Sequence, residues 1–483
     1  MSANLSFNNG GKSTVQTGLF INNKFQPALD GKTFGVVNPA TGEEIAQVSE
    51  ASAKDIDLAV KAARKAYDEV WGEHTPAAQR GKLLMKLADL VEKHNDELAS
   101  IESLDNGKAF SIASSFDVPS VAANLRYFGG WADKNTGQTI EVDSSADFHY
   151  TRHEPIGVCG QIIPWNFPIL MFAWKIAPAL ATGNTVVLKT AEQTPLSALK
   201  MAVLIVEAGF PPGVVNIVSG FGPVAGAAIS AHMDIDKVAF TGSTLVGRNV
   251  MKAAASSNLK KVTLELGGKS PVIVFGDADL DQAVGWAAFG IYFNHGQCCC
   301  AGSRVFVEES AYDEFMQKLS AKVKQVQGMV GDAFDKNTFQ GPQVSQLQFD
   351  RIMAHIESGK KDGATLVSGG ARHGDKGYFI EPTIFTDVKP DAKIAQEEIF
   401  GPVLVVSKFT DEADLLKKAH DTMYGLAASV HTLNIKKGIS VAHKLKAGTG
   451  ELGEPAEARA RTGHLLTRRA ASLPSPPPST AVW

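Results

Sequence analysis

Residues 238–244 read Val-Ala-Phe-Thr-Gly-Ser-Thr, an apolar run followed at once by a glycine between hydroxyl side chains. The apolar run predicts a buried strand, and the residues after it favour a helix that continues to about residue 255. A strand that passes directly into a helix is the repeating unit of parallel sheets whose faces are covered by helices. This stretch therefore predicts an α/β fold.

The same alternation continues on both sides of this stretch. Further strands of a first set are predicted at residues 158–163, 185–188, 214–218 and 262–266. Strands of a second set are predicted at residues 271–275 and 305–307, near residue 384, and at residues 403–406. Helices separate the strands; Thr194 and Pro195 favour the start of one helix, and Gly209 favours its end. Sheets of this doubly wound type bind ligands at the carboxyl ends of their strands.

Two segments interrupt this alternation. Residues 138–153 predict a β-hairpin with a polar tip, which is either an edge strand offered to a partner subunit or a plain surface hairpin. Residues 450–483 are rich in Ala, Arg, Pro and Ser and show no apolar periodicity. The sequence therefore predicts a disordered tail there.

Composition restricts the class of protein. The chain has 483 residues, of which 44% are hydrophobic and 20% charged, with a net charge of −4, so we expect a globular protein of two or three domains. The net charge gives no general attraction to nucleic acid or membrane. With four cysteines, three of them contiguous, a disulfide framework is not expected, and a reducing compartment fits best.

Two checks concern membranes and targeting. The first 18 residues are polar and no arginine precedes Arg64, so neither a secretory signal nor a mitochondrial presequence is predicted, and cytosol is the expected compartment. Residues 155–174 carry no charge and are long enough to span a bilayer, but three prolines interrupt them. A buried parallel strand that runs into a loop explains this segment better.

Residues 296–303 read Gly-Gln-Cys-Cys-Cys-Ala-Gly-Ser and are followed by an apolar run, which predicts a loop that leads into a buried strand. Three adjacent side chains on a bent backbone point in different directions, which argues against a metal site. The remaining interpretations are one nucleophilic thiol or a set of small buried hydrophobes.

Four further groups follow predicted strands and would meet in one crevice. Asn166 lies in a loop flanked by prolines, Lys189 and Glu192 follow a strand, Ser243 begins a helix, and Glu265 lies between apolar neighbours. A helix start is a natural seat for phosphate, and burial should raise the pKa of the Glu265 carboxyl toward the range of a general base.

Each group also has an ordinary structural interpretation. Asn166 could bridge loop backbone, Glu265 could form a salt bridge at a strand end, and Lys189 could be a solvated charge at the rim. The Gly242-Ser243 pair could be a helix cap, and the glycine pattern typical of dinucleotide-binding turns is absent from it.

Taken together, however, these segments closely resemble the aldehyde dehydrogenase superfamily, in particular its broad-specificity NAD(P)-dependent enzymes of fungal type. The segments that carry the resemblance are residues 164–168 (Pro-Trp-Asn-Phe-Pro), 240–244 (Phe-Thr-Gly-Ser-Thr), 264–270 (Leu-Glu-Leu-Gly-Gly-Lys-Ser), 296–302 and 397–402 (Glu-Glu-Ile-Phe-Gly-Pro). The resemblance runs from about residue 18 to residue 448. Some fungal members of the family are mould allergens.

The resemblance implies a catalytic set and a small aldehyde as substrate. Cys299 would be the nucleophile, and the Asn166 amide and the Cys299 backbone N–H would stabilise the oxyanion of a thiohemiacetal. After hydride transfer leaves a thioester, Glu265 would activate water and release the carboxylic acid. No metal is implied.

It also implies a set of cofactor-binding residues. These are Trp165, Lys189, Glu192, Gly242, Ser243, Gly247, Glu398 and Phe400. The turn from Gly242 to Gly247 would hold the pyrophosphate, Lys189 and Glu192 the adenosine ribose, and Glu398 and Phe400 the nicotinamide ribose. Because a carboxylate repels a 2′-phosphate, Glu192 predicts a preference for NAD, with NADP as a possible second cofactor.

The implied architecture has four parts. A discontinuous dinucleotide-binding domain would comprise residues 1–136 and 155–265, interrupted by an oligomerisation hairpin at 137–154. Residues 266–449 would form the catalytic domain, and residues 450–483 a tail unlike the family. The family forms homodimers or homotetramers.

The end of the chain also suggests alternatives. A strand of the catalytic sheet is expected to be missing after residue 449, so the polypeptide would be unstable or poorly active and its subunit assembly incomplete. The rival functions are a specialised semialdehyde or betaine-aldehyde dehydrogenase, and a catalytically impaired structural or binding protein on the same scaffold.

Overall fold

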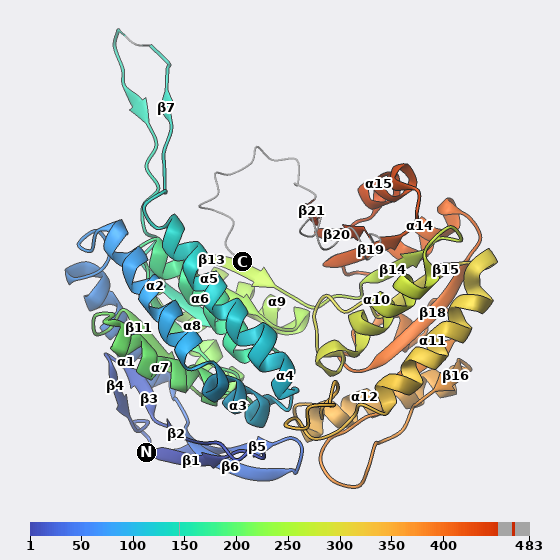
Figure 1. The fold of residues 1–483 in the computed structure, drawn as a ribbon. Helices are drawn as coiled ribbons and strands as arrows, with labels where there is room; N and C mark the ends of the chain where they lie inside the picture. The colour runs from blue at the N-terminus through green and yellow to red at the C-terminus, as the bar shows by residue number, and fades with distance from the viewer. Residues whose placement is uncertain (144, 453–465, 469–483) are drawn as a thin grey trace.

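A computed structural model describes residues 1–143, 145–452 and 466–468 of the chain. Two large sheets lie side by side, each with helices packed against it, and a thin two-stranded arm projects from the first (Figure 1). The predicted α/β fold, with a doubly wound parallel sheet and a second α/β sheet, is confirmed.

The first sheet has seven strands. Their order is β13 (Lys261–Glu265), β12 (Lys237–Thr241), β9 (Val158–Ile162), β10 (Thr185–Lys189), β11 (Val215–Val218), β3 (Leu19–Ile21) and β4 (Lys24–Gln26). The strands from β13 to β11 are parallel, whereas β3 and β4 are antiparallel additions at one edge. The chain runs outward from β9 to β11 and then returns to the other side of β9 for β12 and β13. Such a reversal opens a crevice at the carboxyl ends of the strands.

Helices cover both faces of this sheet. The helices are α1 (Ala53–Glu69), α2 (Ala77–Lys93), α3 (Asn95–Asn106), α4 (Phe110–Ile112), α5 (Val118–Trp131), α6 (Pro168–Ala181), α7 (Leu196–Ala208), α8 (Ala227–Ala231) and α9 (Thr244–Ala255). Val187 packs in the cluster that includes α1, whereas its neighbours Val186 and Leu188 pack in the cluster that includes α2 and α6. Because side chains alternate along a strand, both faces of β10 must be apolar, as the sequence predicted.

The second sheet has eight strands. Their order is β16 (Thr365–Ser368), β17 (Thr383–Thr386), β18 (Val403–Phe409), β15 (Arg304–Glu308), β14 (Pro271–Val274), β19 (Ala427–His431), β20 (Thr449–Leu452) and β21 (Leu466–Arg468). The two edge strands, β16 and β21, are antiparallel and the others parallel. Its helices are α10 (Leu280–Tyr292), α11 (Tyr312–Gln327), α12 (Gln346–Lys361), α13 (Lys393–Gln396), α14 (Glu412–His420) and α15 (Ile435–Lys444).

The end of the chain differs from its prediction. Residues 449–452, where a strand was expected to be missing, form β20 beside β19, and residues 466–468 form β21 beside β20. The prediction of disorder is therefore wrong for these strands, because backbone pairing with β19 does not require an apolar side-chain pattern. The rest of the predicted tail, residues 453–465 and 469–483, lies outside the described residues.

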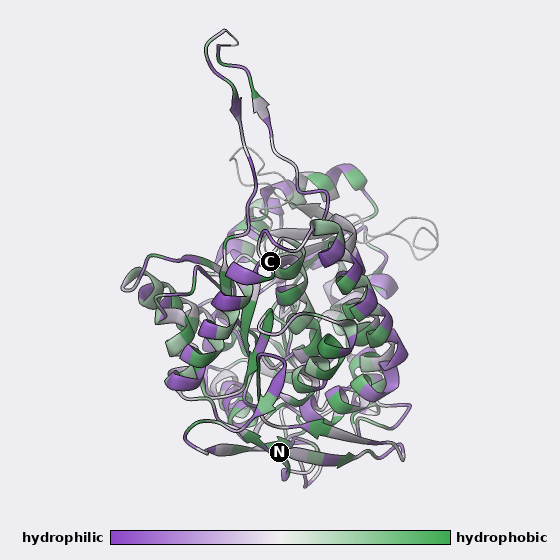
Figure 2. Ribbon diagram, turned by 90° about the vertical axis from the view of Figure 1, so that its left-hand side faces the viewer, coloured by the Kyte–Doolittle hydropathy of each residue, from purple (hydrophilic) through white to green (hydrophobic). Residues whose placement is uncertain are grey.

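Three small antiparallel pairs complete the fold. They are β1 (Ser2–Ser6) with β2 (Lys12–Gln16), β5 (Thr33–Asn38) with β6 (Glu43–Ser49), and β7 (Thr139–Ile140) with β8 (His149–Tyr150). The last pair is the predicted hairpin, which stands clear of the body in both views (Figures 1 and 2). Phe148 and Tyr150 on it are 76% and 58% exposed.

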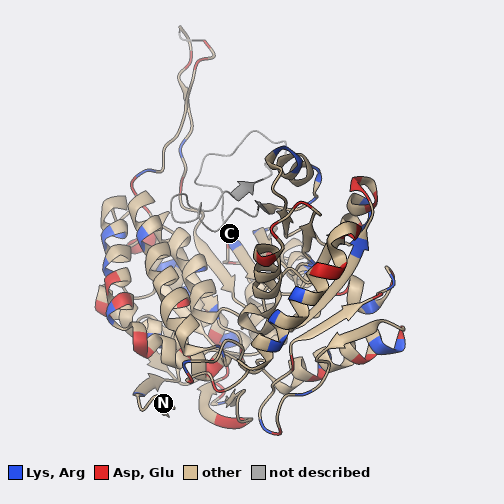
Figure 3. Cartoon of the chain, turned by 45° about the vertical axis from the view of Figure 1, so that its right-hand side comes forward, with Lys and Arg blue, Asp and Glu red and all other residues tan. Residues whose placement is uncertain are grey.

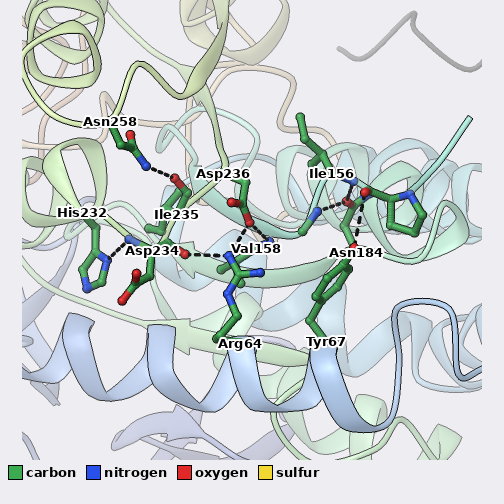
Figure 4. Close-up of polar contacts among 12 residues, drawn as sticks. Arg64, Tyr67, Ile156, Val158, Asn184, His232, Asp234, Ile235, Asp236 and Asn258 are labelled. Carbon is green, nitrogen blue, oxygen red and sulfur yellow. Dashed lines mark hydrogen bonds and ion pairs between the residues drawn. The ribbon is translucent and has the colours of Figure 1, made fainter.

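The amino end of β9 is tied to the layers around it (Figure 4). Val158 N donates to Asp236 Oδ2 at 2.7 Å, and the same oxygen accepts from Arg64 of α1. Ile156 N donates to Asn184 Oδ1 at 2.6 Å. These bonds fix the amino end of the central strand β9, and they do not involve its carboxyl end.

Residues of both charges occur on the helices, with acidic and basic positions interspersed in both halves of the molecule (Figure 3). Within the described part of the chain, every helix is too short or too polar to cross a bilayer. Residues 158–162, from the uncharged segment that was checked as a membrane span, form the fully buried strand β9.

Candidate active site

The three adjacent cysteines lie in the loop between α10 and β15. The backbone before them is left-handed at three consecutive residues, with φ of 49° at Asn294, 60° at His295 and 75° at Gly296. A Cβ added to Gly296 would lie 2.1 Å from the backbone of Gly401, so only glycine fits there. The loop therefore follows one path, against the segment that begins β18.

Side chains of this loop also bond to distant backbone. His295 Nδ1 accepts from Gly341 N at 2.7 Å, and Gln297 Oε1 accepts from Val344 N at 3.0 Å. Both side chains are fully buried, and burial lowers the pKa of His295 to about 3, so this histidine is a neutral acceptor. The cysteines are thus presented by an anchored loop.

The three thiols are not equivalent. Cys298 packs against the apolar clusters of both sheets, Cys299 is half-buried and Cys300 is exposed. The Sγ atoms of Cys298 and Cys300 are 3.4 Å apart. Hydrogen bonds from its neighbours lower the pKa of Cys300. At Cys299, hydrogen bonding to Cys298 lowers the pKa, but Cys300, burial and the charge of Glu265 together raise it.

Asn166 lies beside this loop. Its Nδ2 donates to the backbone oxygen of Gln297 at 2.9 Å, and the side chain is buried. The interpretation of Asn166 as a bridge to loop backbone is therefore correct, but the bridge reaches the cysteine loop rather than its own. An amide carries two N–H groups, so one donor of Asn166 remains for another acceptor.

Glu265 is the last residue of β13. The charge of its carboxylate raises the pKa of Cys299, and the charge of Cys300 raises the pKa of Glu265. Burial raises the pKa of Glu265, as the sequence predicted, while the charge of Lys175 opposes the rise. Among the described residues, no cation lies within salt-bridge distance of Glu265, so the salt-bridge interpretation is wrong.

Lys175 was missed by sequence reasoning. It lies on α6 and is 3% exposed, and burial lowers its pKa to about 8. The available signal was a single lysine in the otherwise uncharged run of residues 168–181. A buried charge needs a nearby counter-charge, and for Lys175 the charge of Glu265 raises the pKa.

Lys189 and Glu192 form a pair at the carboxyl end of β10. Lys189 Nζ donates to Thr190 O at 2.8 Å and lies 3.3 Å from Glu192 Oε2. Lys189 is 3% exposed, and burial lowers its pKa. The interpretation of Lys189 as a solvated rim charge is therefore wrong. Glu192 is half-buried, and its carboxylate pairs with Lys189.

Ser243 caps α9, since its Oγ accepts from Val246 N at 3.4 Å. Gly242 N donates to the backbone oxygen of Glu265 at 3.0 Å, which joins this turn to the end of β13. A Cβ on Gly247 would lie 2.7 Å from the side chain of Leu266, so glycine allows α9 to approach β13 closely. Ser243 is therefore a helix cap, as the ordinary interpretation predicted. A capped helix start is also compatible with the predicted phosphate site.

Glu398 and Phe400 line a pocket together with Gly296 and Cys298 of the cysteine loop, and Phe400 contacts Trp165. Glu398 Oε1 accepts from Gly268 N at 3.1 Å, and burial raises the pKa of Glu398. The rings of Trp165 and Phe400 pack edge to face, with their centroids 5.1 Å apart. This small pocket is lined by Gly268, Cys298, Glu398 and Phe400 together with seven neighbouring residues.

The structure thus gathers most of the predicted site residues, but not all by direct contact. Asn166 bonds to the cysteine loop at Gln297 O, the charge of Glu265 acts on Cys299, and the rings of Trp165 and Phe400 are in contact. Among the described residues, no hydrogen bond or ion pair joins the Lys189–Glu192 pair to Ser243 or Glu398. The described residues hold no cluster suited to a metal ion. This arrangement defines an α/β enzyme with a thiol site at the carboxyl edge of its first sheet.

Known proteins match this chain over nearly its whole length. The sequence matches the aldehyde dehydrogenase family over residues 25–464. It is 65% identical over 448 residues to an aldehyde dehydrogenase of Alternaria alternata, which covers 93% of this chain and 89% of that protein. An aldehyde dehydrogenase of Emericella nidulans is 63% identical over 432 residues, or 89% of this chain and 86% of that one.

A solved structure agrees. The NAD+ complex of an aldehyde dehydrogenase from Bacillus cereus has a TM-score of 0.88 and 52% sequence identity, covering 90% of this chain and 88% of that one. The chain therefore belongs to the aldehyde dehydrogenase family. Membership makes it an NAD(P)-dependent oxidoreductase that acts on aldehydes. The family match extends past residue 448, where the resemblance was expected to stop.

Proposed function

We propose that this enzyme oxidises aldehydes to carboxylic acids through a covalent adduct on Cys299. The observation that carries the proposal is the convergence of a thiol, an amide and a carboxylate from three separate segments. Asn166 bonds to the cysteine loop at Gln297 O, and the charge of Glu265 reaches Cys299. A nucleophile, an oxyanion donor and a base are the groups that this reaction requires.

The first step is attack of the Cys299 sulfur on the aldehyde carbon. As the carbon–sulfur bond forms, the proton of the Cys299 thiol passes to water, so the Glu265 carboxylate is kept for the second half of the reaction. The carbonyl oxygen becomes an oxyanion, which the second N–H of Asn166 and the backbone N–H of Cys299 would stabilise. When bound, NAD(P) accepts the hydride from this adduct.

The second half of the reaction releases the acid. The thioester on Cys299 is attacked by water, and Glu265 takes a proton from that water. Burial raises the pKa of Glu265, which makes its carboxylate a stronger base, while the charge of Lys175 opposes that rise. After the acid leaves, Glu265 gives this proton to solvent, which restores the carboxylate for the next turnover.

The residues present fit NAD(P). Gly247 lets α9 lie close to β13, and the helix start at Ser243 offers backbone N–H groups for the pyrophosphate. Glu192 would bond the adenosine ribose, with Lys189 beside it, and Glu398 the nicotinamide ribose. A carboxylate at this position favours NAD over NADP.

The proposal is tested by trapping the adduct. Purified Glu265→Gln is incubated with a simple aliphatic aldehyde and NAD, digested, and analysed by mass spectrometry. We expect NADH equal to about one turnover and the mass of the acyl group on Cys299, because the variant forms the thioester but hydrolyses it slowly. An unmodified Cys299 peptide, or acyl mass on Cys300, contradicts the assignment. Multiple rapid turnovers contradict the role of Glu265.

Other features stay proposals. Substrate profiling separates a broad enzyme from a semialdehyde or betaine-aldehyde specialist, and absence of NADH formation favours the structural or binding protein. We also propose the domain division at residues 265 and 266, between β13 and β14, and homo-oligomerisation through the exposed hairpin. The cytosolic location and the allergen association stay predictions.

A further inference from the structure

The buried side chain of Asn294 joins the two loops of the site. Its Nδ2 donates to the backbone oxygen of Asn166 at 2.9 Å and to that of Gln297 at 3.1 Å. Both N–H groups of one amide are therefore used, one on each loop. The two acceptors belong to the residue that carries the proposed oxyanion donor and to the residue two positions before Cys299.

These contacts close a small network. Asn166 Nδ2 donates to the same Gln297 oxygen at 2.9 Å, so Gln297 O accepts from both amides. Asn106 Nδ2 adds a bond to Trp165 O at 2.8 Å behind the loop. Because Asn294 holds both the backbone of Asn166 and the acceptor of its side chain, it restricts the rotation of the Asn166 amide.

The backbone of Asn294 explains why asparagine suits this position. Its φ and ψ are 49° and 36°, in the left-handed region, where asparagine is one of the few residues tolerated besides glycine. The side chain is 1% exposed, so water does not replace its two bonds when they are lost.

We propose that Asn294 is a positioning residue that orients the Asn166 amide, so that its second N–H faces the oxyanion formed at Cys299. This inference rests on the proposed function and adds a residue to it. Asn294 touches no substrate; it acts through Asn166 and Gln297. A small displacement of a catalytic group can reduce turnover by about a hundredfold, so an effect of this kind is measurable.

The test uses three single variants, two of Asn294 and one of Asn166, and one double variant. Asn294→Gly removes the amide while accommodating the left-handed backbone, and Asn294→Asp keeps the shape but turns an oxygen toward the two carbonyl groups. Asn166→Ala and the double variant Asn166→Ala with Asn294→Gly complete a cycle. Steady-state kcat and KM for an aliphatic aldehyde are measured together with thermal unfolding.

A matched control is available at Asn258 (Figure 4). Its Nδ2 also donates to two backbone oxygens, those of Met233 at 2.7 Å and Ile235 at 3.0 Å, but at the amino end of β13, away from the site. Asn258→Ala therefore removes two bonds of the same type, together with the bond that Asn258 Oδ1 accepts from Lys260 N. It should lower thermal stability and change kcat by no more than about twofold. The effects of substitutions at distant sites are usually independent, so a loss of stability at Asn258 should not alter the reaction at the cysteine loop.

We expect Asn294→Gly to lower kcat by about 10-fold to 100-fold with little change in KM, and Asn294→Asp to lower it at least as much. We expect the double variant to be no slower than Asn166→Ala alone, because Asn294 acts through that amide. Fully multiplicative effects, or a kcat for Asn294→Gly equal to that of Asn258→Ala, overturn the proposal.

The two levels of hypothesis fail differently. If Asn166→Ala keeps the parent kcat, the proposed oxyanion role of Asn166 is wrong. If Asn166→Ala is slow but the Asn294 variants are not, only the positioning role is wrong. Should Asn294→Gly fail to fold, Asn294→Asp, which preserves side-chain volume, provides the same cycle with Asn166→Ala.

Discussion

The loop that carries the cysteines and the strand end that carries Lys189 are held in opposite ways. Lys189 bonds to Thr190 and Glu192, one and three residues away. The cysteine loop is held by bonds from Asn294 to Asn166 and from His295 to Gly341, which span 128 and 46 residues. The thiol site thus depends on long-range packing, whereas the proposed cofactor contact is set by a local turn.

This difference has a physical cause. A group that meets an extended cofactor can be placed by a strand end, since several weak contacts share the task. A nucleophile, an oxyanion donor and a base must meet within hydrogen-bond distance, which requires three segments to be fixed together. Changes in the cysteine loop should therefore affect turnover most, and changes at the local turns should affect selectivity or stability.

The largest expected effect is at the cysteines. Cys299→Ala should lower kcat by at least about a thousandfold, because no other group forms the covalent adduct. Cys298→Ala and Cys300→Ala should retain activity within about tenfold. NADH formation by the three purified variants gives the comparison. Loss of activity in Cys300→Ala alone would transfer the nucleophile to the exposed thiol, whose pKa its neighbours lower.

An intermediate effect is expected at the local turn. Glu192→Gln removes the carboxylate that repels a 2′-phosphate, so the ratio of kcat/KM for NADP to that for NAD should rise about tenfold, equivalent to about 1.4 kcal/mol. Activity with NAD should fall much less than in Cys299→Ala. Glu207→Gln, on the exposed face of α7, is the control. An unchanged ratio would remove Glu192 from the cofactor site.

A smaller effect concerns pH. Burial raises the pKa of Glu265 and the charge of Lys175 opposes this rise, so Lys175→Met should raise the pKa further. Since the base acts when deprotonated, the acid limb of the kcat profile should move to higher pH. Lys261→Met, at the exposed start of β13, should leave the limb in place. A limb that moves to lower pH, or stays, would mean that Lys175 does not act on Glu265.

The smallest effect is expected at the helix cap. Ser243→Ala removes the Oγ that accepts from Val246 N, which should lower the free energy of unfolding by about 1 kcal/mol or less. Denaturant unfolding measures it, with Ser256→Ala at the other end of α9 as a control. A loss of several kcal/mol would show that the turn is held as tightly as the cysteine loop, against the comparison drawn above.

Much of the fold followed from local patterns. The central strands of the first sheet were predicted from their apolar runs, and the left-handed Gly209 ends α7 as expected. The prediction of a disordered tail failed at β20. This strand pairs with β19 through backbone hydrogen bonds and has no apolar side-chain pattern from which it could be predicted. Lys175 was missed for a related reason, since nothing in a helix sequence shows which distant carboxylate its charge will meet.

By itself, the sequence determined the α/β alternation, the strand ends that carry Asn166, Lys189 and Glu265, and the cysteine loop, because these depend on apolar periodicity and turn residues close in the chain. Only the tertiary structure decided that Asn166 reaches Gln297, that Lys175 opposes the pKa rise of Glu265, and that Asn294 joins two loops. Such contacts depend on how separate segments pack against one another, and no local pattern specifies them.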